Sequence, residues 1–173
     1  MKVWRPVSSL LPGLAAAQYS DRYPVIDQQV GALGELVASA YLDELGIRHT
    51  IESQISHDIK LDSGLTIDVK TTTSWYSVTG EHTHKIYHKL QEYQTADYFM
   101  FINLKIVHGT HESTDLNRFT GANIMGILNA AELFKIARPV NDNAKYYTGR
   151  REFNVPMLEV KYKQLLPVVA LVG

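Results

Sequence analysis

Two aspartates and a lysine within residues 57–71 are the residue types best suited to chemistry in this chain. In the second half of this segment, the alternation of side chains along a strand places Asp68 and Lys70 on one face. The apolar residues between and before them take the other face, which must meet a core. Asp58 lies on the polar face of the preceding strand, together with Lys60. The pattern predicts one hairpin face that carries two carboxylates and an amine.

The length of the turn between these two strands sets their register. A three-residue loop at 62–64 ends in the glycine that its left-handed position requires, and it pairs Leu61 with Leu65. Counting back, Asp58 then lies opposite Asp68, with Cβ atoms ~5 Å apart. A two-residue loop would mix polar and apolar residues on each face, so the three-residue loop is favoured.

Two aspartates that face each other repel, at a cost of up to ~1 kcal/mol. A hard divalent cation converts this repulsion into binding, and Mg²⁺ or Mn²⁺ takes carboxylate oxygens while Mg²⁺ keeps several waters. Lys70 is then placed to orient an attacking water and to offset charge on a phosphorane-like transition state. Replacement of Asp68 by Asn is expected to stabilise the metal-free protein. The alternative is the solvated polar face of an ordinary hairpin, where Asp and Lys are common.

A third carboxylate, Glu35, falls within a segment of helical periodicity, residues 29–45, which Gly46 ends. Its stripe of the helix consists of small and apolar residues: Gly31, Gly34, Ala38, Leu42 and Leu45. A carboxylate in such surroundings needs a partner. Glu35 therefore either completes the polar site of the hairpin or reaches solvent at the helix edge.

Together these residues resemble the PD-(D/E)XK nuclease superfamily. Its signature is a helix with a glutamate, then a hairpin carrying an aspartate and a (D/E)-x-K motif. Here the signature reads Gly34-Glu35, His57-Asp58 and Asp68-Val69-Lys70, with a histidine where the family often has proline. The resemblance covers about residues 29–104. It implies an α/β fold with a single mixed central β-sheet flanked by helices, in a restriction-endonuclease-like core of order α-β-β-β-α-β.

The resemblance also implies roles for the site residues. Asp58, Asp68 and the backbone carbonyl of Val69 would bind Mg²⁺ or Mn²⁺, Lys70 would act on the water, and Glu35 would assist the metal or its waters. The implied activity is metal-dependent hydrolysis of DNA phosphodiester bonds by an endonuclease, similar to junction resolvases, small phage nucleases and intron-type endonucleases. Many such nucleases are homodimers, although the sequence has no dimer motif. The alternative is a non-catalytic nucleic-acid-binding or structural protein on the same scaffold.

The rest of the pattern indicates one mixed α/β domain, since 173 residues suit a single domain. Its expected parts are an irregular N-terminal extension (1–28), a core (about 29–136), and a C-terminal loop and extension (137–173). Strands are predicted at 48–61, 65–72, 97–104 and 122–128, and helices at 84–94 and after the capping residue Asn129. The alternating segment 157–163 favours a strand, with a short helix after Pro156 as the alternative.

The amino-acid composition excludes several other classes of protein. The chain has no cysteine, which excludes disulfides and cysteine-ligated zinc and fits a cytoplasmic location, or the host-cell cytoplasm for a viral protein. No stretch approaches the ~20 apolar residues of a membrane span, so no membrane partner is expected.

Two surface features could contact DNA. Four basic residues in the predicted polar loop 137–151 suggest a phosphate-binding flap, with a solvated loop as the alternative: Arg138, Lys145, Arg150 and Arg151. Just past the hairpin, Trp75 and Tyr76 could stack on bases or could simply pack.

Overall fold

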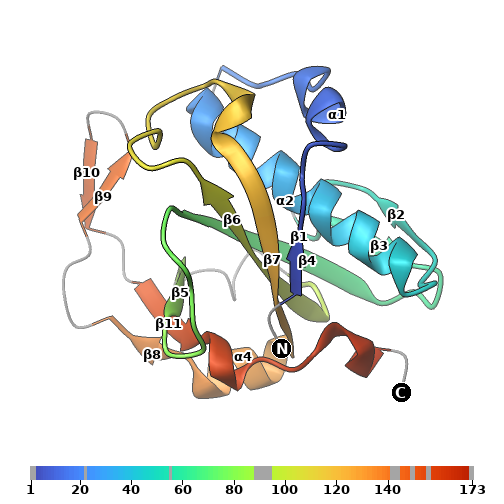
Figure 1. Cartoon of the computed structure of the whole chain (residues 1–173). Helices are drawn as coiled ribbons and strands as arrows, with labels where there is room; N and C mark the ends of the chain where they lie inside the picture. The colour runs from blue at the N-terminus through green and yellow to red at the C-terminus, as the bar shows by residue number, and fades with distance from the viewer. Residues whose placement is uncertain are drawn as a thin grey trace.

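The computed structural model of the chain has an α/β architecture around a curled, mixed sheet of six strands. Helix α2 (Val25–Glu44) lies on one face of this sheet, and a smaller sheet with helix α4 (Ala130–Ile136) lies on the other (Figure 1). The structure describes residues 3–21, 23–54, 56–87, 95–140, 145–148, 151–154 and 157–171.

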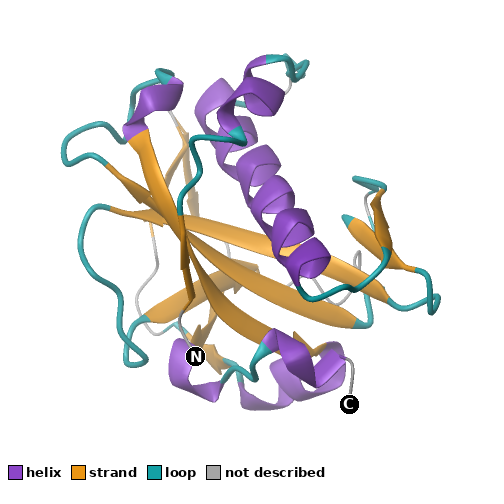
Figure 2. Ribbon diagram, turned by 45° about the vertical axis from the view of Figure 1, so that its right-hand side comes forward, coloured by secondary structure: helices purple, strands orange, loops and turns teal. Residues whose placement is uncertain are grey.

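The central sheet confirms the predicted mixed strand directions. In spatial order its strands are β1 (Val3–Arg5), β7 (Phe119–Asn129), β6 (Tyr98–Ile106), β4 (Thr66–Ser74), β3 (Ile59–Leu61) and β2 (His49–Ile51). Strands β4 and β6 are parallel, and the other neighbours are antiparallel (Figure 2). The two edge strands have only three residues each, which limits the unpaired backbone at the edges.

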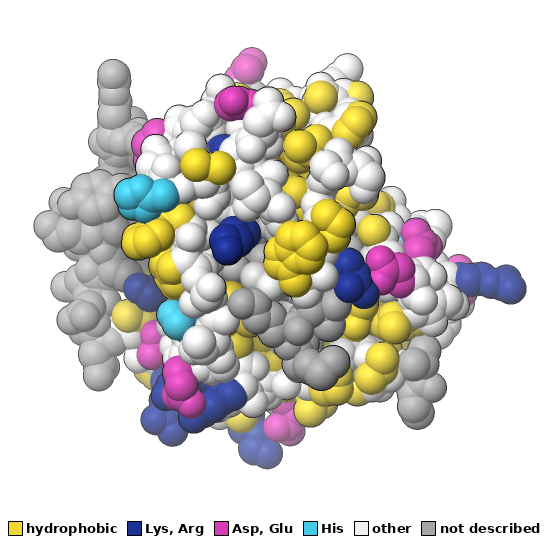
Figure 3. Space-filling model, in the orientation of Figure 1, with side chains coloured by type: hydrophobic (Ala, Val, Ile, Leu, Met, Phe, Trp, Pro, Cys, Tyr) yellow, Lys and Arg dark blue, Asp and Glu magenta, His cyan; other side chains and the backbone are white. Residues whose placement is uncertain are grey.

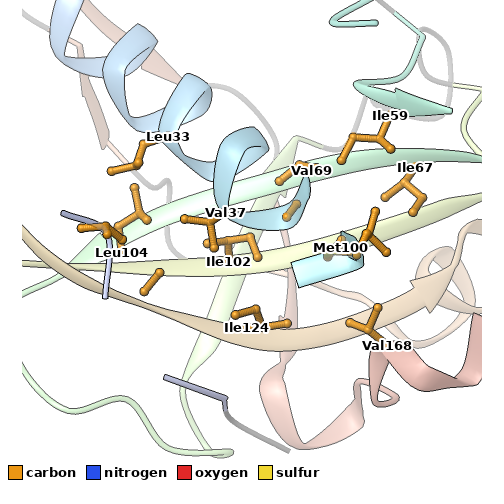
Figure 4. Packing of buried hydrophobic residues seen from close by; sticks show 14 of the residues in the cluster. Leu33, Val37, Ile59, Ile67, Val69, Met100, Ile102, Leu104, Ile124 and Val168 are labelled. Atoms are coloured by element: carbon orange, nitrogen blue, oxygen red, sulfur yellow. The ribbon is translucent and has the colours of Figure 1, made fainter. Parts of the chain in front are cut away.

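Helix α2 packs on the sheet through apolar residues at helical spacing. Leu33 and Val37 point from the helix toward sheet residues such as Val69 and Ile102 (Figure 4). Burial of each such side chain contributes ~1.5–3 kcal/mol. Gly34 allows a close approach, because a Cβ there would collide with the Thr71 side chain of β4.

The opposite face of the sheet is covered by β5 (Thr83–Tyr87), β11 (Met157–Lys161) and β8 (Arg138–Pro139), which pair in the order β5-β11-β8. Phe99 and Phe101 of β6 form the centre of the buried cluster on this side. The same face of β4 carries Asp68 and Lys70, so the candidate site lies on the side of the small sheet.

Shorter elements complete the described chain: α1 (Leu11–Ala15), the antiparallel pair β9 (Lys145–Thr148) and β10 (Arg151–Asn154), and 3-10 turns at Leu116–Arg118, Tyr162–Gln164 and Val168–Leu171. Among the described residues, no helix has the length and apolar character to cross a lipid bilayer.

Several predicted elements are confirmed. The strands at 97–104 and 122–128 are β6 and β7, and 157–163 is a strand up to Lys161. Asn129 caps α4 as predicted, because its side chain accepts a hydrogen bond from the Ala131 N–H.

Other predicted elements are wrong in part. The helix expected from residue 29 begins at Val25, and the N-terminal segment is not irregular, because β1 joins the central sheet. Residues 48–61 form two strands, β2 and β3, that pair with each other. Residues 137–151 contain β8 and β9 instead of a continuous loop.

The helix expected at 84–94 is wrong over its first four residues, which belong to β5. Burial there alternates, with His84 and Ile86 buried and Lys85 exposed, because these residues face the core from a strand. Residues 88–94 lie outside the described part of the chain.

Candidate active site

The hairpin of β3 and β4 has the predicted register. Ile59 pairs with Ile67, and the Leu61 N–H donates to the Leu65 carbonyl at 2.8 Å. Gly64 has φ +91°, the left-handed conformation that the three-residue loop requires. The odd turn therefore sets the faces of this hairpin as expected from the sequence.

Regular pairing stops one residue short of the predicted Asp58–Asp68 pair. The Asp58 N–H donates to the Ile67 carbonyl at 3.0 Å, although Ile67 is the partner of Ile59. The Asp58 carboxylate also turns toward β4, where its Oδ2 accepts a hydrogen bond from the Val69 N–H at 2.7 Å. Asp58 is thus fixed to the backbone of the strand that carries Asp68.

The pKa of Asp58 reflects its burial and the crowding of carboxylates around it. Burial, followed by the negative charge of Asp68, raises the pKa of Asp58 to about 7, against the opposing effect of the Val69 N–H. The charge of Glu35 and a side-chain hydrogen bond with Asp68 raise it further. The two aspartate side chains therefore lie close together. The one amine beside them, that of Lys70, can neutralise only one of the two negative charges.

Asp68 is the more deeply placed carboxylate, with an exposed fraction of 2%. Lys70 Nζ lies 2.9 Å from its Oδ2, and the amine also lies 5.8 Å from the centre of the Phe99 ring. The contact supplies charge but lacks hydrogen-bond geometry, so this buried Oδ2 accepts no hydrogen bond. Asp68 consequently keeps an acceptor position available inside the site.

Glu35 approaches this pair from α2. Its Oε2 accepts a hydrogen bond from the Ser53 hydroxyl at 2.6 Å. Burial raises the pKa of Glu35, the Ser53 hydroxyl lowers it, and the charge of Asp68 raises it. The structure thus places Glu35 within electrostatic reach of Asp68, as a partner at the edge of the site.

The oxygen atoms of this site suit a hard divalent cation as ligands. Carboxylate oxygens of Asp58 and Asp68, with the carbonyl of Val69, are the oxygen ligands that Mg²⁺ prefers. Within the described residues, however, no group of three or more His, Asp or Glu side chains is arranged to hold a metal ion. The unpaired Oδ2 and the crowded aspartates fit a cation held by two carboxylates and by waters, with Glu35 acting on those waters.

A loop between β2 and β3 contributes residues that periodicity did not reveal. The N–H groups of Glu52 and Ser53 both donate to the Asp58 carbonyl, at 2.7 and 3.1 Å. Ser53 adopts φ +46°, a conformation that costs energy in a non-glycine residue. His57 Nε2 lies 2.8 Å from Glu52 Oε2 across the same loop. No signal in the sequence indicated this support of Asp58, because Glu52 and Ser53 fall inside the single strand predicted at 48–61.

Behind Lys70 lies a buried histidine. Burial and then the charge of Lys70 lower the pKa of His84 to about 3, so the ring is neutral. Its Nδ1 lies 3.3 Å from the Tyr162 hydroxyl, and its ring meets Phe101 edge to face. Lys70 is therefore bordered by Asp68 and by neutral aromatic groups, which favours its interaction with that carboxylate.

The four basic residues predicted to bind phosphate do not belong to one loop. Arg138 lies in β8 and is exposed, whereas Lys145 and Arg151 lie in β9 and β10. Arg150 lies outside the described residues. Phosphate binding by these residues thus remains a prediction. The described basic residues lie on two separate strand pairs, β8 with β11 and β9 with β10.

Comparison of the chain with models of protein families, with curated proteins and with solved structures gave no match.

Proposed function

We propose that this protein is a nuclease that depends on Mg²⁺ or Mn²⁺ and hydrolyses DNA phosphodiester bonds as an endonuclease. The observation that supports it best is the pair of the partly buried Asp58 and the buried Asp68, with Lys70 beside it: burial, followed by the charge of Asp68, raises the pKa of Asp58 to about 7. A carboxyl group with a pKa raised in this way, next to a second carboxylate, favours a functional site over a solvated hairpin face.

The restriction-endonuclease-like core forms part of the same proposal. Helix α2 and strands β2, β3, β4 and β6 follow in the order helix, three strands and a further strand. The connection from β4 to β6 holds β5 and residues outside the described part of the chain. A DNA partner, a homodimer and a cytoplasmic location are also proposed here.

In this proposal Asp58, Asp68 and the Val69 carbonyl hold the cation, which would polarise the scissile phosphate and acidify a bound water. Lys70 orients that water and offsets negative charge as the phosphate is attacked. Glu35, held by Ser53, positions waters at the edge of the site. A cation held there would also favour the ionised form of Asp58, because a nearby positive charge lowers a carboxylate pKa.

A second candidate is a non-catalytic nucleic-acid-binding protein on this scaffold. It is favoured by the Lys70 amine, which already neutralises Asp68, and by the lack of a three-carboxylate cage among the described residues. In that case the Asp68–Lys70 pair serves stability and no turnover occurs.

Cleavage assays separate the two candidates. Plasmid, branched and single-stranded DNA are incubated with Mg²⁺ or Mn²⁺ and, in parallel, with chelator. We expect metal-dependent cleavage that Lys70→Ala reduces by at least about a hundredfold, since removal of one charge-stabilising group costs this much in other enzymes. Lys135→Ala is the control, because Lys135 is an exposed lysine of α4 with only an exposed partner.

Asp68→Asn should abolish cleavage as well, with an unchanged circular dichroism spectrum. Cleavage that survives in both site variants would refute the proposed site. A complete lack of cleavage by the parent protein on all three substrates would favour the non-catalytic candidate.

A further inference from the structure

A row of residues crosses the central sheet away from the candidate active site. Gly121 of β7 pairs with Lys105 of β6, which pairs with Ser74 at the end of β4. Trp4 of β1 lies over Gly121, with its Nε1 2.5 Å from the place that a Cβ of Gly121 would occupy. The indole can lie there only because residue 121 has no side chain. Trp4 is 54% exposed.

Four aromatic rings continue this row where β4 ends. Trp75 lies against Tyr76 and His108, with ring centres 5.4 and 4.5 Å apart. Tyr76 stacks on His82 at 5.4 Å. Both Trp75 and Tyr76 are 46% exposed, so much of their ring surface faces solvent. Trp4, Lys105 and these four rings are called the aromatic surface below.

The charge next to these rings is positive. Lys105 has no ion-pair partner within the described part of the chain, and its side chain is partly exposed. The acidic neighbour of His82, Glu81, is neutralised by Lys161 and Lys163 at 3.1 and 2.6 Å. In Figure 3, hydrophobic and His side chains lie over the loop ends of β4 and β6, and separate Lys or Arg side chains lie between them and the region of β1.

Exposed aromatic rings beside a lysine have the chemistry of a platform for unpaired nucleobases. Every base has a π face that can stack on an aromatic side chain, whereas a lysine attracts the phosphate between two bases. Two strand spacings, ~10 Å, separate Gly121 from Ser74, so Lys105 stands between Trp4 and the four-ring cluster. A paired duplex would not present its base faces to these rings.

The aromatic surface and the candidate active site share strand β4. Lys70 precedes Ser74 by four residues, a distance of ~13 Å along a strand. Both residues lie on the same face, since side chains of β4 alternate. Because β5 and β11 cover this face of β4, a strand of DNA held by Trp75 and Tyr76 would pass beside that cover, and the separation from the active site corresponds to a few nucleotides.

We propose that the aromatic surface binds an unpaired DNA strand, with bases stacked on Trp75, Tyr76 and Trp4 and a phosphate on Lys105. This inference rests on the proposed nuclease function for the identity of its ligand as DNA. It extends that function by naming the substrate class: DNA in which a single strand adjoins the scissile bond, as in branched or flapped structures.

The chain contains two tryptophans, and both lie on the aromatic surface. Intrinsic tryptophan fluorescence therefore reports on this surface directly. The full-length protein is titrated in chelator with an oligothymidylate, with an abasic oligonucleotide of the same length, and with a blunt duplex. Quenching by the oligothymidylate is expected at concentrations at which the abasic strand and the duplex have little effect.

Variants are tested by the anisotropy of a labelled oligothymidylate. Trp75→Leu should weaken binding about five- to a hundredfold, the range that loss of one stacked base gives. Lys105→Gln should lower the slope of log affinity against log salt by about 0.7. Tyr23→Leu and Lys135→Gln replace an exposed aromatic residue and an exposed lysine elsewhere, and should leave binding unchanged.

Several outcomes would overturn the inference. They are equal affinity for the abasic strand, preference for blunt duplex, and unchanged binding by Trp75→Leu. Failure of the proposed nuclease function would look different, because binding is measured without metal. Metal-dependent cleavage by a protein that ignores oligothymidylate refutes the aromatic surface alone, whereas oligothymidylate binding without any cleavage refutes the nuclease alone.

Discussion

Asp58 and Asp68 carry the same functional group, but their surroundings give them different effects on stability. Asp68 has the amine of Lys70 at 2.9 Å. The Asp58 carboxylate accepts a hydrogen bond from the Val69 N–H, and its charged neighbours are the carboxylates of Asp68 and Glu35. From the sequence we expected Asp68→Asn to stabilise the metal-free protein. The structure instead leads us to expect this stabilisation from Asp58→Asn.

Asp58→Asn should raise the free energy of unfolding by at least ~1 kcal/mol in chelator at pH 8, because repulsion of a facing like-charge pair is worth up to this much and burial of the charge adds to it. The amide oxygen of Asn can still accept the hydrogen bond from Val69. For a domain of this size, each kcal/mol should raise the melting temperature by about 2–4 °C. Asp68→Asn should destabilise instead, because it leaves the partly buried amine of Lys70 without its partner.

The pH dependence of this gain follows from the pKa of Asp58, about 7 in the folded protein and 3.8 ordinarily. Between these values the folded state binds more protons than the unfolded state, so this group lowers stability as pH rises from about 4 to 7. The advantage of Asp58→Asn should be greatest above pH 7 and should vanish toward pH 4. A constant advantage across this range would contradict the raised pKa.

The pH dependence of Asp58 must be measured as the difference in stability between the parent protein and Asp58→Asn, because His84 changes the stability of the parent with pH in the opposite direction. Its pKa is lowered from 6.5 to about 3, so the unfolded state takes up the proton as pH falls below about 6.5. Stability of the parent protein therefore decreases on that account. The His84 contribution is the same in parent and variant and cancels in the difference.

At the scale of elements, the site depends on a close approach of α2 to β4 at Gly34. Gly34→Ala would place a methyl group against the Thr71 side chain, only 2.8 Å from the Cβ atom of Thr71. This collision would push α2, and Glu35 with it, away from the sheet. We expect a loss of ~1–3 kcal/mol, the range of overpacking, in spite of the better helix propensity of Ala.

Gly31→Ala is the matched control, because a Cβ at residue 31 meets nothing within 4 Å. This substitution should stabilise by up to ~1 kcal/mol. Urea unfolding of both variants measures the difference. Equal effects of the two substitutions would show that the contact of Gly34 with β4 is not tight.

The sequence predicted those elements whose signals are local. The turn at 62–64 set the register of β3 and β4, and the apolar runs of β6 and β7 identified two central strands. It did not predict the break between β2 and β3. That break depends on hydrogen bonds of Glu52 and Ser53 to the Asp58 carbonyl, which form only when the chain turns back.

At the scale of the whole molecule, the site depends on what covers each face of the sheet. Periodicity placed Asp68 and Lys70 together, but it gave no sign that β5 and β11 would cover their side. His84 of β5 is buried and neutral beside Lys70, and the burial of the neighbouring carboxyl groups is what raises the pKa of Asp58 on this hairpin face. Such pairing of distant segments has no short-range signal in a single sequence.

The central claim is that Asp58 and Asp68 together hold one divalent cation, and thermal melting with and without metal tests it most directly. The parent protein is melted in chelator and in about 10 mM Mg²⁺ or Mn²⁺, with NaCl matched for ionic strength. A cation bound with a Kd near 1 mM should stabilise the parent by ~1.4 kcal/mol, or about 3–5 °C. Asp58→Asn and Asp68→Asn should gain much less. A parent protein that gains nothing from either metal, or variants that gain as much as the parent, would contradict the two-aspartate metal site.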